Sequence, residues 1–246
     1  LTRITWVNIF IYPKLKNIFI TLFEKFMMPS TDFAVRSFIG GYDKNLTYII
    51  TCMQTGTHII VDAAIKLNRL KPFIGTEPVA LLITHTHGDH IAFLDDYTQA
   101  FTNIVIVGHP ESQAILDVDR FKPVENDSRF SVGRLKLNAI HTPGHYFDSV
   151  CYTLENVIFT GDTLFVGRTG RTISTRSNIN ELYDSVYNKI IPLPPQTRIY
   201  PGHDYGPEPS ITIEKNIEIS PLLQAKNKVD FISRMEQYER TRKPGE

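Results

Sequence analysis

The sequence predicts a single domain of the mixed α/β class, and three observations carry this prediction. A chain of 246 residues is long enough to bury a full core. No linker, repeat or low-complexity tract divides it. From Asp32 onward, short β-type runs alternate with turns and with windows of helical periodicity. We therefore expect strands assembled into sheets, with helices packed against them.

Eight runs of β-branched and apolar residues are the predicted strands. They cover residues 47–52, 58–63, 80–85, 104–109, 135–142, 149–154, 157–162 and 197–203. Polar groups able to bind metal follow several of these runs at their carboxyl ends. Because such strand ends share one edge in layered α/β folds, we expect these groups to converge on one cleft.

Three helices are predicted between and after the strands. Pro110 begins one over "ESQAILD", and Asn178 caps another over "INELYDSVYNKII", in which Leu182, Val186 and Ile190 repeat every four residues. The last lies within residues 225–240 and is expected to pack on the outside of the domain. The apolar residues on one side of this last helix are Val229, Ile232 and Met235.

The chain is expected to divide into three parts. Residues 1–29 are rich in aromatic and apolar residues, but Pro13, Lys14 and Lys16 interrupt them, so the run is too short for a membrane span of about 20 apolar residues. We interpret it as an extension upstream of a native start at Met27 or Met28, with an interfacial amphipathic segment as the alternative. Residues 30–210 form the predicted main domain, and residues 211–246 form a helical segment packed on it.

Composition narrows the class of protein and its partners. Lysine plus arginine and aspartate plus glutamate number 26 each, so the basic field typical of nucleic-acid binding is missing. Cys52 and Cys151 lie in apolar strand-like runs and indicate buried thiols in a reducing compartment. We expect a cytoplasmic protein with a small-molecule substrate and neither a nucleic-acid partner nor a stable membrane insertion. The sequence leaves the oligomeric state open, a homodimer being one option.

The segment "LLITHTHGDHIAF" (81–93) is the strongest chemical signal in the chain. His85 and His87 are two residues apart and point the same way in an extended segment, so both can reach one cation. Asp89 and His90 follow a glycine at which the chain is expected to turn into a helix, so they serve a second cation. Burying four such side chains within six residues without a cation would leave polar groups unpaired, and the segment therefore predicts a metal site.

Further ligand candidates follow later strands. His145 comes after the run that ends at residue 142, and Asp162 and His203 close the runs that end at residues 162 and 203. Asp162 is the natural bridge, because a carboxylate has two oxygens and can hold two cations together. Two such cations hold a hydroxide between them and make a nucleophile at neutral pH, with Asp89 and Asp162 as the predicted catalytic carboxylates. The remaining histidines are predicted to be structural: His58, His109 and His141.

Four motifs occur together in a fixed order: "THTHGDH" (84–90), "TPGH" (142–145), "FTGD" (159–162) and "YPGHD" (200–204). In order and spacing they resemble the metallo-β-lactamase superfamily. The resemblance implies a four-layer αββα sandwich with a metal cleft at one edge of its two sheets. It also implies that His85, His87 and His145 bind one metal, that Asp89, His90 and His203 bind a second, and that Asp162 is shared. Zinc is the first expectation, with iron or manganese as alternatives.

Within that superfamily, "GDTLFVGRTGR" (161–171) and "PGHDYGPEPS" (201–210) resemble the glyoxalase II branch, the hydroxyacylglutathione hydrolases. Arg171 and Tyr205 match its glutathione-binding positions, and Arg168 is a further candidate for holding a substrate carboxylate. The resemblance implies that a bridging hydroxide attacks a thioester or a related small ester. Thr169, Ile173 and "ISPLL" (219–223) depart from the glyoxalase II pattern, which leaves the thiol open. The aspartate at position 162 argues against a true β-lactamase.

Two alternatives remain. A persulfide dioxygenase of this superfamily binds one iron through the equivalents of His85, His145 and Asp162. The segment "RTGRTI" (168–173) lacks the cysteine and the aspartate usual in that branch, so the hydrolase is favoured. A non-catalytic metal-binding module would be expected to lose at least one of the seven ligands, and the sequence keeps all seven.

Overall fold

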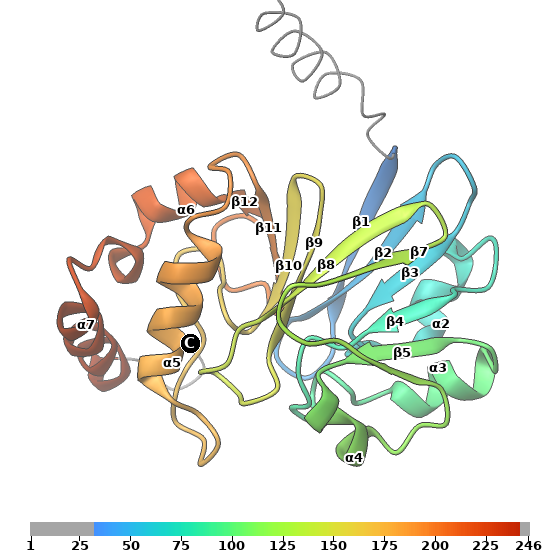
Figure 1. Ribbon diagram of the computed structural model, residues 1–246, viewed down its shortest axis with the longest axis horizontal. Helices are drawn as coiled ribbons and strands as arrows, with labels where there is room; N and C mark the ends of the chain where they lie inside the picture. The colour runs from blue at the N-terminus through green and yellow to red at the C-terminus, as the bar shows by residue number, and fades with distance from the viewer. Residues whose placement is uncertain (1–31, 242–246) are drawn as a thin grey trace, which may run out of the picture. The chain divides into compact units, whose positions relative to one another are not determined.

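The computed structural model describes residues 32–241, which form a mixed α/β domain built on two sheets (Figure 1). The first sheet has the order β1-β2-β3-β4-β5-β6 and the second the order β12-β11-β10-β9-β8-β7. The strands of the first sheet are β1 (Phe33–Gly40), β2 (Asn45–Cys52), β3 (His58–Val61), β4 (Ala80–Leu82), β5 (Val105–Gly108) and β6 (Phe121–Pro123). Those of the second are β7 (Ser128–Val132), β8 (Leu135–His141), β9 (Val150–Leu154), β10 (Val157–Gly161), β11 (Arg198–Pro201) and β12 (Ile211–Thr212).

All eight predicted strands are present, and β1, β6, β7 and β12 are additional. The extra strands lie at or next to the sheet edges. β1 alternates between half-buried and exposed residues, and β12 is only two residues long. Such edge strands bury few side chains, so their apolar pattern is too weak to be read from the sequence.

The two sheets pack face to face over the main core. β2 shows why the sequence produces this arrangement, because successive side chains of a strand point to opposite faces. Tyr48 and Ile50 contact the core between the sheets, whereas Ile49 faces the helices outside the first sheet. From the second sheet, Leu137, Tyr152 and Phe159 close the same inner core.

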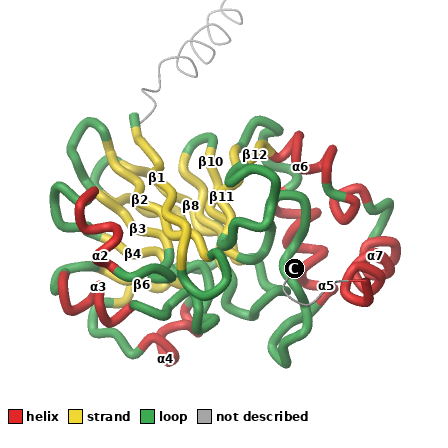
Figure 2. Tube along the Cα trace, turned by 180° about the vertical axis from the view of Figure 1, so that it is seen from behind, coloured by secondary structure: helices red, strands yellow, loops and turns green. Residues whose placement is uncertain are grey.

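Helices cover the outer face of each sheet (Figures 1 and 2). On the first sheet lie α2 (Leu67–Leu70), α3 (Leu94–Ala100) and α4 (Gln113–Leu116), with 3-10 turns at Lys71–Phe73 and Pro110–Ser112. On the second lie α5 (Ile179–Ser185), which continues as a π-helical turn Val186–Ile190, α6 (Ile213–Ile219), a 3-10 turn Pro221–Gln224 and α7 (Lys228–Thr241). The four-layer αββα sandwich is therefore confirmed.

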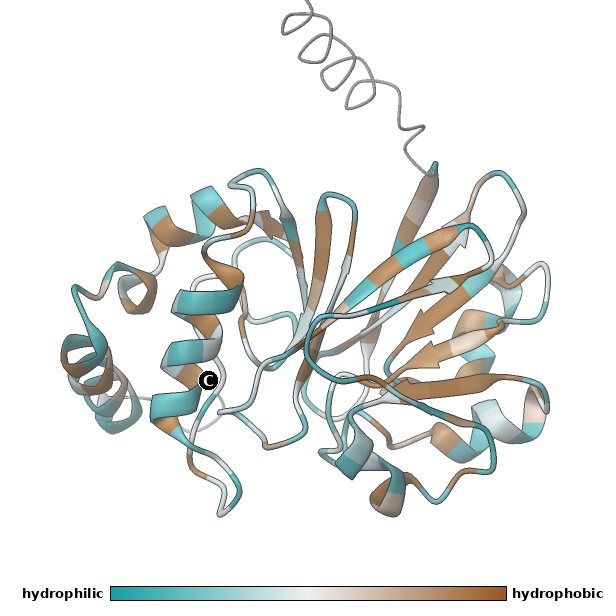
Figure 3. Cartoon of the chain, in the orientation of Figure 1, coloured by the Kyte–Doolittle hydropathy of each residue, from teal (hydrophilic) through white to brown (hydrophobic). Residues whose placement is uncertain are grey.

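The helix predicted after Asn178 is confirmed in detail. The Asn178 side chain accepts hydrogen bonds from the backbone N–H groups of Asn180 and Glu181, and so caps α5. The repeating residues Leu182, Val186 and Ile190 are all buried against the second sheet. Bands of hydrophobic and hydrophilic residues alternate along α5 in Figure 3.

The packing face predicted for α7 is partly wrong. Val229 is 77% exposed, whereas Phe231 and Met235 are fully buried in the core outside the second sheet. A spacing of four residues keeps these two on one side of a helix with 3.6 residues per turn, and Val229 lies away from that side. Ile232 is partly buried against the same core.

The predicted N-terminal extension and its methionines lie outside the described residues. Across residues 32–241, no helix combines the length and the apolar content needed to cross a bilayer.

Candidate metal centre

Three histidines meet beyond the carboxyl end of β4. His85 and His87 lie in the extended segment that follows this strand, and His145 lies in the loop between β8 and β9. His87 Nδ1 is 3.0 Å from His85 Nε2 and 3.0 Å from His145 Nε2. The expectation that His85 and His87 reach a common point therefore agrees with the geometry.

In His145 and His85, the ring nitrogen that points away from this group contacts a neighbouring residue. His145 Nδ1 lies 2.8 Å from the carbonyl oxygen of Arg171, and His85 Nδ1 lies 3.2 Å from Thr84 Oγ1. These contacts orient both rings so that Nε2 faces the shared point, as in proteins whose metal-binding histidines use the second nitrogen for a hydrogen bond.

A second donor group consists of Asp89, His90 and His203. The segment after Gly88 forms a turn, and helix α3 begins four residues after His90, at Leu94. His203, which follows β11, places its Nε2 3.2 Å from His90 Nε2 and 3.3 Å from Asp89 Oδ2. Asp89 lies apart from His85 and His87, but the ring centroid of His90 is 4.1 Å from that of His85, and His85, His90 and Asp162 form a third possible donor set.

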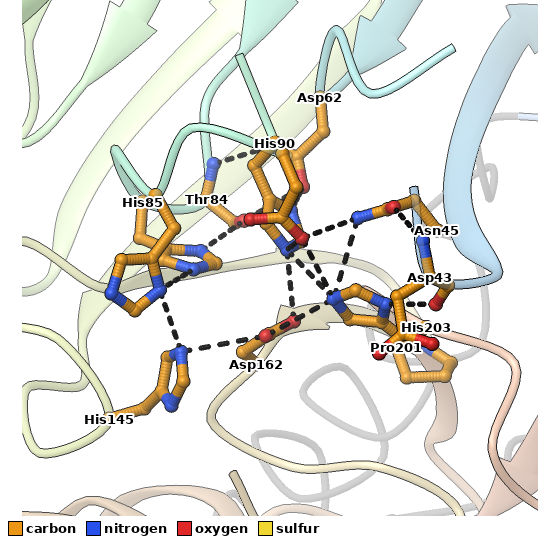
Figure 4. Close-up of polar contacts among 12 residues, drawn as sticks. Asp43, Asn45, Asp62, Thr84, His85, His90, His145, Asp162, Pro201 and His203 are labelled. Carbon is orange, nitrogen blue, oxygen red and sulfur yellow. Dashed lines mark hydrogen bonds and ion pairs between the residues drawn. The ribbon is translucent and has the colours of Figure 1, made fainter. Parts of the chain in front are cut away.

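Asp162 stands between the two groups, directly after β10 (Figure 4). Its Oδ1 is 3.1 Å from His90 Nε2, while its Oδ2 is 3.3 Å from His203 Nε2 and 3.5 Å from His145 Nε2. One carboxylate therefore contacts members of both donor groups. Oδ1 is buried, and in spite of its closeness to His90 it accepts no hydrogen bond.

The donor arrangement suits divalent cations. Nitrogens bound to zinc at about 2.0–2.1 Å in a tetrahedron lie about 3.3 Å apart, close to the nitrogen separations of 3.0 to 3.2 Å found here. The buried Oδ1 of Asp162 is a further mark of a cation site, because it forms an ion pair with His90 but accepts no hydrogen bond. The absence of a side chain at Gly202 matters as well, since a Cβ there would lie 2.3 Å from Asp162 Oδ1.

The two donor groups differ in their electrostatics. Burial lowers the pKa values of His85, His87 and His145, that of His87 to about 4, so these rings stay neutral, which is the form that binds a metal. Burial also lowers the pKa of His203, but the charge of Asp162 outweighs burial and raises it to about 9. Asp162 has a pKa well below its usual range: burial raises it, but the charges of His90 and His203 outweigh burial.

Residues 40–203 match the metallo-beta-lactamase superfamily. The chain belongs to this superfamily. It is 28% identical over 196 residues to a Bacillus subtilis protein named "Probable polyketide biosynthesis zinc-dependent hydrolase PksB", covering 76% of this chain and 85% of that protein. It is 33% identical over 178 residues to the hydroxyacylglutathione hydrolase of Francisella tularensis subsp. novicida, covering 69% of this chain and 67% of the relative.

Among solved structures of similar fold is the crystal structure of ETHE1 from Myxococcus xanthus. It superposes with a TM-score of 0.74 at 28% identity, and the match covers 82% of this chain and 90% of that one. Membership of the metallo-beta-lactamase superfamily is thus supported by sequence and by structure.

Two residues that contact the candidate metal ligands were not predicted from the sequence. Buried Asp62, which follows β3, accepts hydrogen bonds from the backbone N–H and Oγ1 of Thr84, and its Oδ2 lies 2.8 Å from His90 Nδ1. It shares with the ligands the pattern of a polar residue after a buried strand, which was a usable signal. Asn45, which donates to Asp89, carries no such signal, because it stands at the start of strand β2 and does not follow a buried strand.

The three predicted substrate-binding residues, Arg168, Arg171 and Tyr205, line a cavity of about 60 Å³ next to His145 and Asp162. Each of these three side chains contacts another residue of the protein. Tyr205 donates a hydrogen bond of 2.5 Å to Asp43 Oδ2, and Arg168 lies 4.3 Å above the Tyr205 ring. Arg168 and Arg171 also contact α7, which the sequence analysis did not connect with the site.

The three histidines predicted to be structural lie outside both donor groups. His58 Nδ1 is 2.9 Å from Thr51 Oγ1, and its Nε2 accepts a hydrogen bond from the Gly75 N–H. His141 Nε2 is 2.9 Å from the carbonyl oxygen of Phe147, and its ring stacks on His109 at 4.2 Å.

Proposed function

We propose that this protein is a dinuclear metallo-hydrolase that cleaves a thioester of a small thiol. The observation that carries the proposal is the pair of three-donor groups joined by Asp162, which together offer a ligand set for two cations. A hydroxyacylglutathione hydrolase and a zinc-dependent hydrolase among the relatives support this choice of chemistry.

In this proposal, His85, His87 and His145 hold one divalent cation, preferably zinc, and Asp89, His90 and His203 hold the other, with Asp162 shared. Cations bound there supply a lowered pKa of coordinated water, roughly 7, and a Lewis acid for the substrate carbonyl. Asp62 and the Asp43 carbonyl keep the rings of His90 and His203 turned inward.

The protein's own groups prepare the attack on the thioester. Asp89 is 31% exposed and Asn45 donates to its Oδ2, so in this proposal the positioned carboxylate accepts a hydrogen bond from the attacking water. Burial raises the pKa of Asp89, but the hydrogen bond from His203 and the charge of His90 outweigh this effect and keep the carboxylate ionised. On the substrate side, Phe165 and Tyr205 wall the cavity and limit access of bulk water, and Arg168 offers a cation for a polar group of the substrate.

The experiment compares two reactions of the purified, metal-loaded protein. S-lactoylglutathione is monitored for thiol release, and glutathione persulfide is monitored for oxygen uptake. Thiol release without oxygen uptake supports the hydrolase, whereas oxygen uptake without thioester cleavage overturns it. Asp162→Ala is expected to abolish whichever activity is found, and an Asp162→Ala variant with full rate would remove the shared carboxylate from the proposal.

A second candidate is a mononuclear iron persulfide dioxygenase. The closeness of His85, His145 and Asp162 favours it, because they offer two imidazoles and a carboxylate of the kind that binds iron(II) on one face. We rank it second because the segment "RTGRTI" (168–173) lacks the cysteine and the aspartate usual in that branch.

A further inference from the structure

We propose that Glu239 is a specificity-determining residue that directs the site toward thioesters without a carboxylate on their thiol arm. It does so by occupying the guanidinium of Arg171, the group expected to bind a substrate carboxylate. The inference rests on the proposed thioester hydrolysis and specifies its substrate class.

Arg171 and Glu239 form a two-pronged ion pair. Arg171 Nε donates to both carboxylate oxygens at 3.0 Å, and Nη2 donates to Oε2 at 2.7 Å. This fork geometry is the one in which a guanidinium binds a ligand carboxylate. Glu239 therefore stands where the carboxylate of an anionic substrate would stand. The side chains are 40% and 21% exposed, so water and salt weaken the pair and a competing anion can displace it.

The preceding residue of α7 engages the other candidate arginine. The Tyr238 hydroxyl accepts a hydrogen bond of 2.6 Å from Arg168 Nη1. Tyr238 also lines the cavity of about 60 Å³ beside His145. These contacts place α7 at the approach to the metal centre.

The surroundings of Glu239 also disfavour an anionic thiol arm. A groove of about 460 Å³ runs between α7 and the segment that follows Arg171. Its apolar wall includes Ile173, Ile179 and Met235, and its charged lining residues, Glu236 and Glu239, are both acidic. A neutral arm can lie in this groove, whereas a carboxylate would meet like charge.

The pair is not needed to hold α7 on the domain. Phe231 and Met235 are fully buried in the core outside the second sheet, one to two turns before Glu239. Removing the charge of Glu239 is therefore expected to change ligand binding while the helix stays in place.

Binding of two thioethers that cannot be hydrolysed tests the inference on the metal-loaded protein. S-methylglutathione carries carboxylates, and the methyl thioether of pantetheine is neutral. In Glu239→Gln, calorimetry is expected to show binding of S-methylglutathione that is about tenfold tighter, because one bidentate charge-assisted site is freed. Binding of the neutral thioether is expected to change less than about twofold.

Two controls make the test specific. Glu236→Gln removes a charge from the same groove without touching the ion pair, and it is expected to change the preference for S-methylglutathione over the neutral thioether much less than Glu239→Gln does. Combining Glu239→Gln with Arg171→Gln is expected to cancel the gain, as a double-mutant cycle requires when two residues act on one contact. The inference would be overturned if the Glu236 and Glu239 variants had equal effects on binding of S-methylglutathione. It would also be overturned if Glu239→Gln did not change the preference for S-methylglutathione over the neutral thioether.

The outcome is separable from that of the proposed function, because the assay follows binding and not turnover. If the wild-type protein hydrolyses thioesters but Glu239→Gln leaves the preference unchanged, only the role of Glu239 falls. If Glu239→Gln gains affinity for S-methylglutathione but no thioester is cleaved, the proposed hydrolysis falls and the competition for Arg171 stands.

Discussion

Asn45 donates a hydrogen bond of 2.8 Å from its side-chain nitrogen to Asp89 Oδ2. Its side-chain oxygen accepts from the backbone N–H groups of Tyr42 and Asp43, so the amide is fixed from both ends. The same turn between β1 and β2 presents the Asp43 carbonyl oxygen, which lies 2.7 Å from His203 Nδ1. One hairpin turn thus positions two of the three donors in the second group.

Replacing Asn45 is therefore expected to affect the second cation selectively. In Asn45→Ala, Asp89 loses its hydrogen bond, and the affinity of the second site is expected to fall by about 10–100-fold, while the first site stays filled. Metal content measured during titration with a chelator reports the two sites separately. Asn180→Ala, an exposed asparagine on α5, is the matched control. Full retention of both metals in Asn45→Ala would contradict the positioning role.

Gly202 is expected to be required because of space and not because of flexibility. A Cβ at this position would lie 2.3 Å from Asp162 Oδ1 and 2.7 Å from His90 Cε1. Gly202→Ala should displace the shared carboxylate and reduce bound metal and activity together. In Gly88→Ala, within the histidine motif itself, the added methyl group meets nothing within 4 Å, so metal binding should persist. Metal analysis of the two variants compares them directly, and equal loss in both would refute the steric explanation.

Asp62 is expected to stabilise the fold as well as the metal centre. Its buried carboxylate is bound by Thr84 and lies 2.8 Å from His90, and its backbone has a positive φ of 59°, which aspartate tolerates better than most residues. Asp62→Ala leaves these partners unpaired and should lower the free energy of unfolding by about 3–5 kcal/mol in urea titrations. Exposed Asp96→Ala should cost less than about 1 kcal/mol. Similar costs for the two variants would show that the buried contacts of Asp62 contribute little.

Cys151 is expected to make the fold sensitive to alkaline pH. Burial raises the pKa of its thiol from 9.0 to about 11, so the unfolded chain releases this proton at a lower pH than the folded protein. Stability from this group is complete below pH 9 and is lost as the pH rises toward 11, by about 1.4 kcal/mol at pH 10. Urea titrations of wild type and Cys151→Ala at pH 8 and pH 10 should show this difference. The same loss of stability between pH 8 and pH 10 in wild type and Cys151→Ala would contradict the role of this thiol.

The clustering of the candidate metal donors follows from a local pattern. His85 and His87 share a direction in an extended segment, and Asp89 and His90 come after the turn at Gly88, so these four side chains lie close together. His145, Asp162 and His203 follow predicted strands whose ends share an edge. The two sheets and the capped α5 could be predicted for the same reason, since alternation and capping are short-range patterns.

The contacts that complete the site were decided by the tertiary structure. Asn45 meets Asp89 across 44 positions, and Arg171 meets Glu239 across 68, and no local pattern marks either partner. The sequence alone determined the fold class and the candidate donor residues, because strand periodicity and ligand spacing act within a few residues. Only the packing of β2 and α7 against the site decided which side chains orient the candidate ligands and which arginine side chains remain available to a substrate. Those contacts depend on where segments distant in the sequence come to lie.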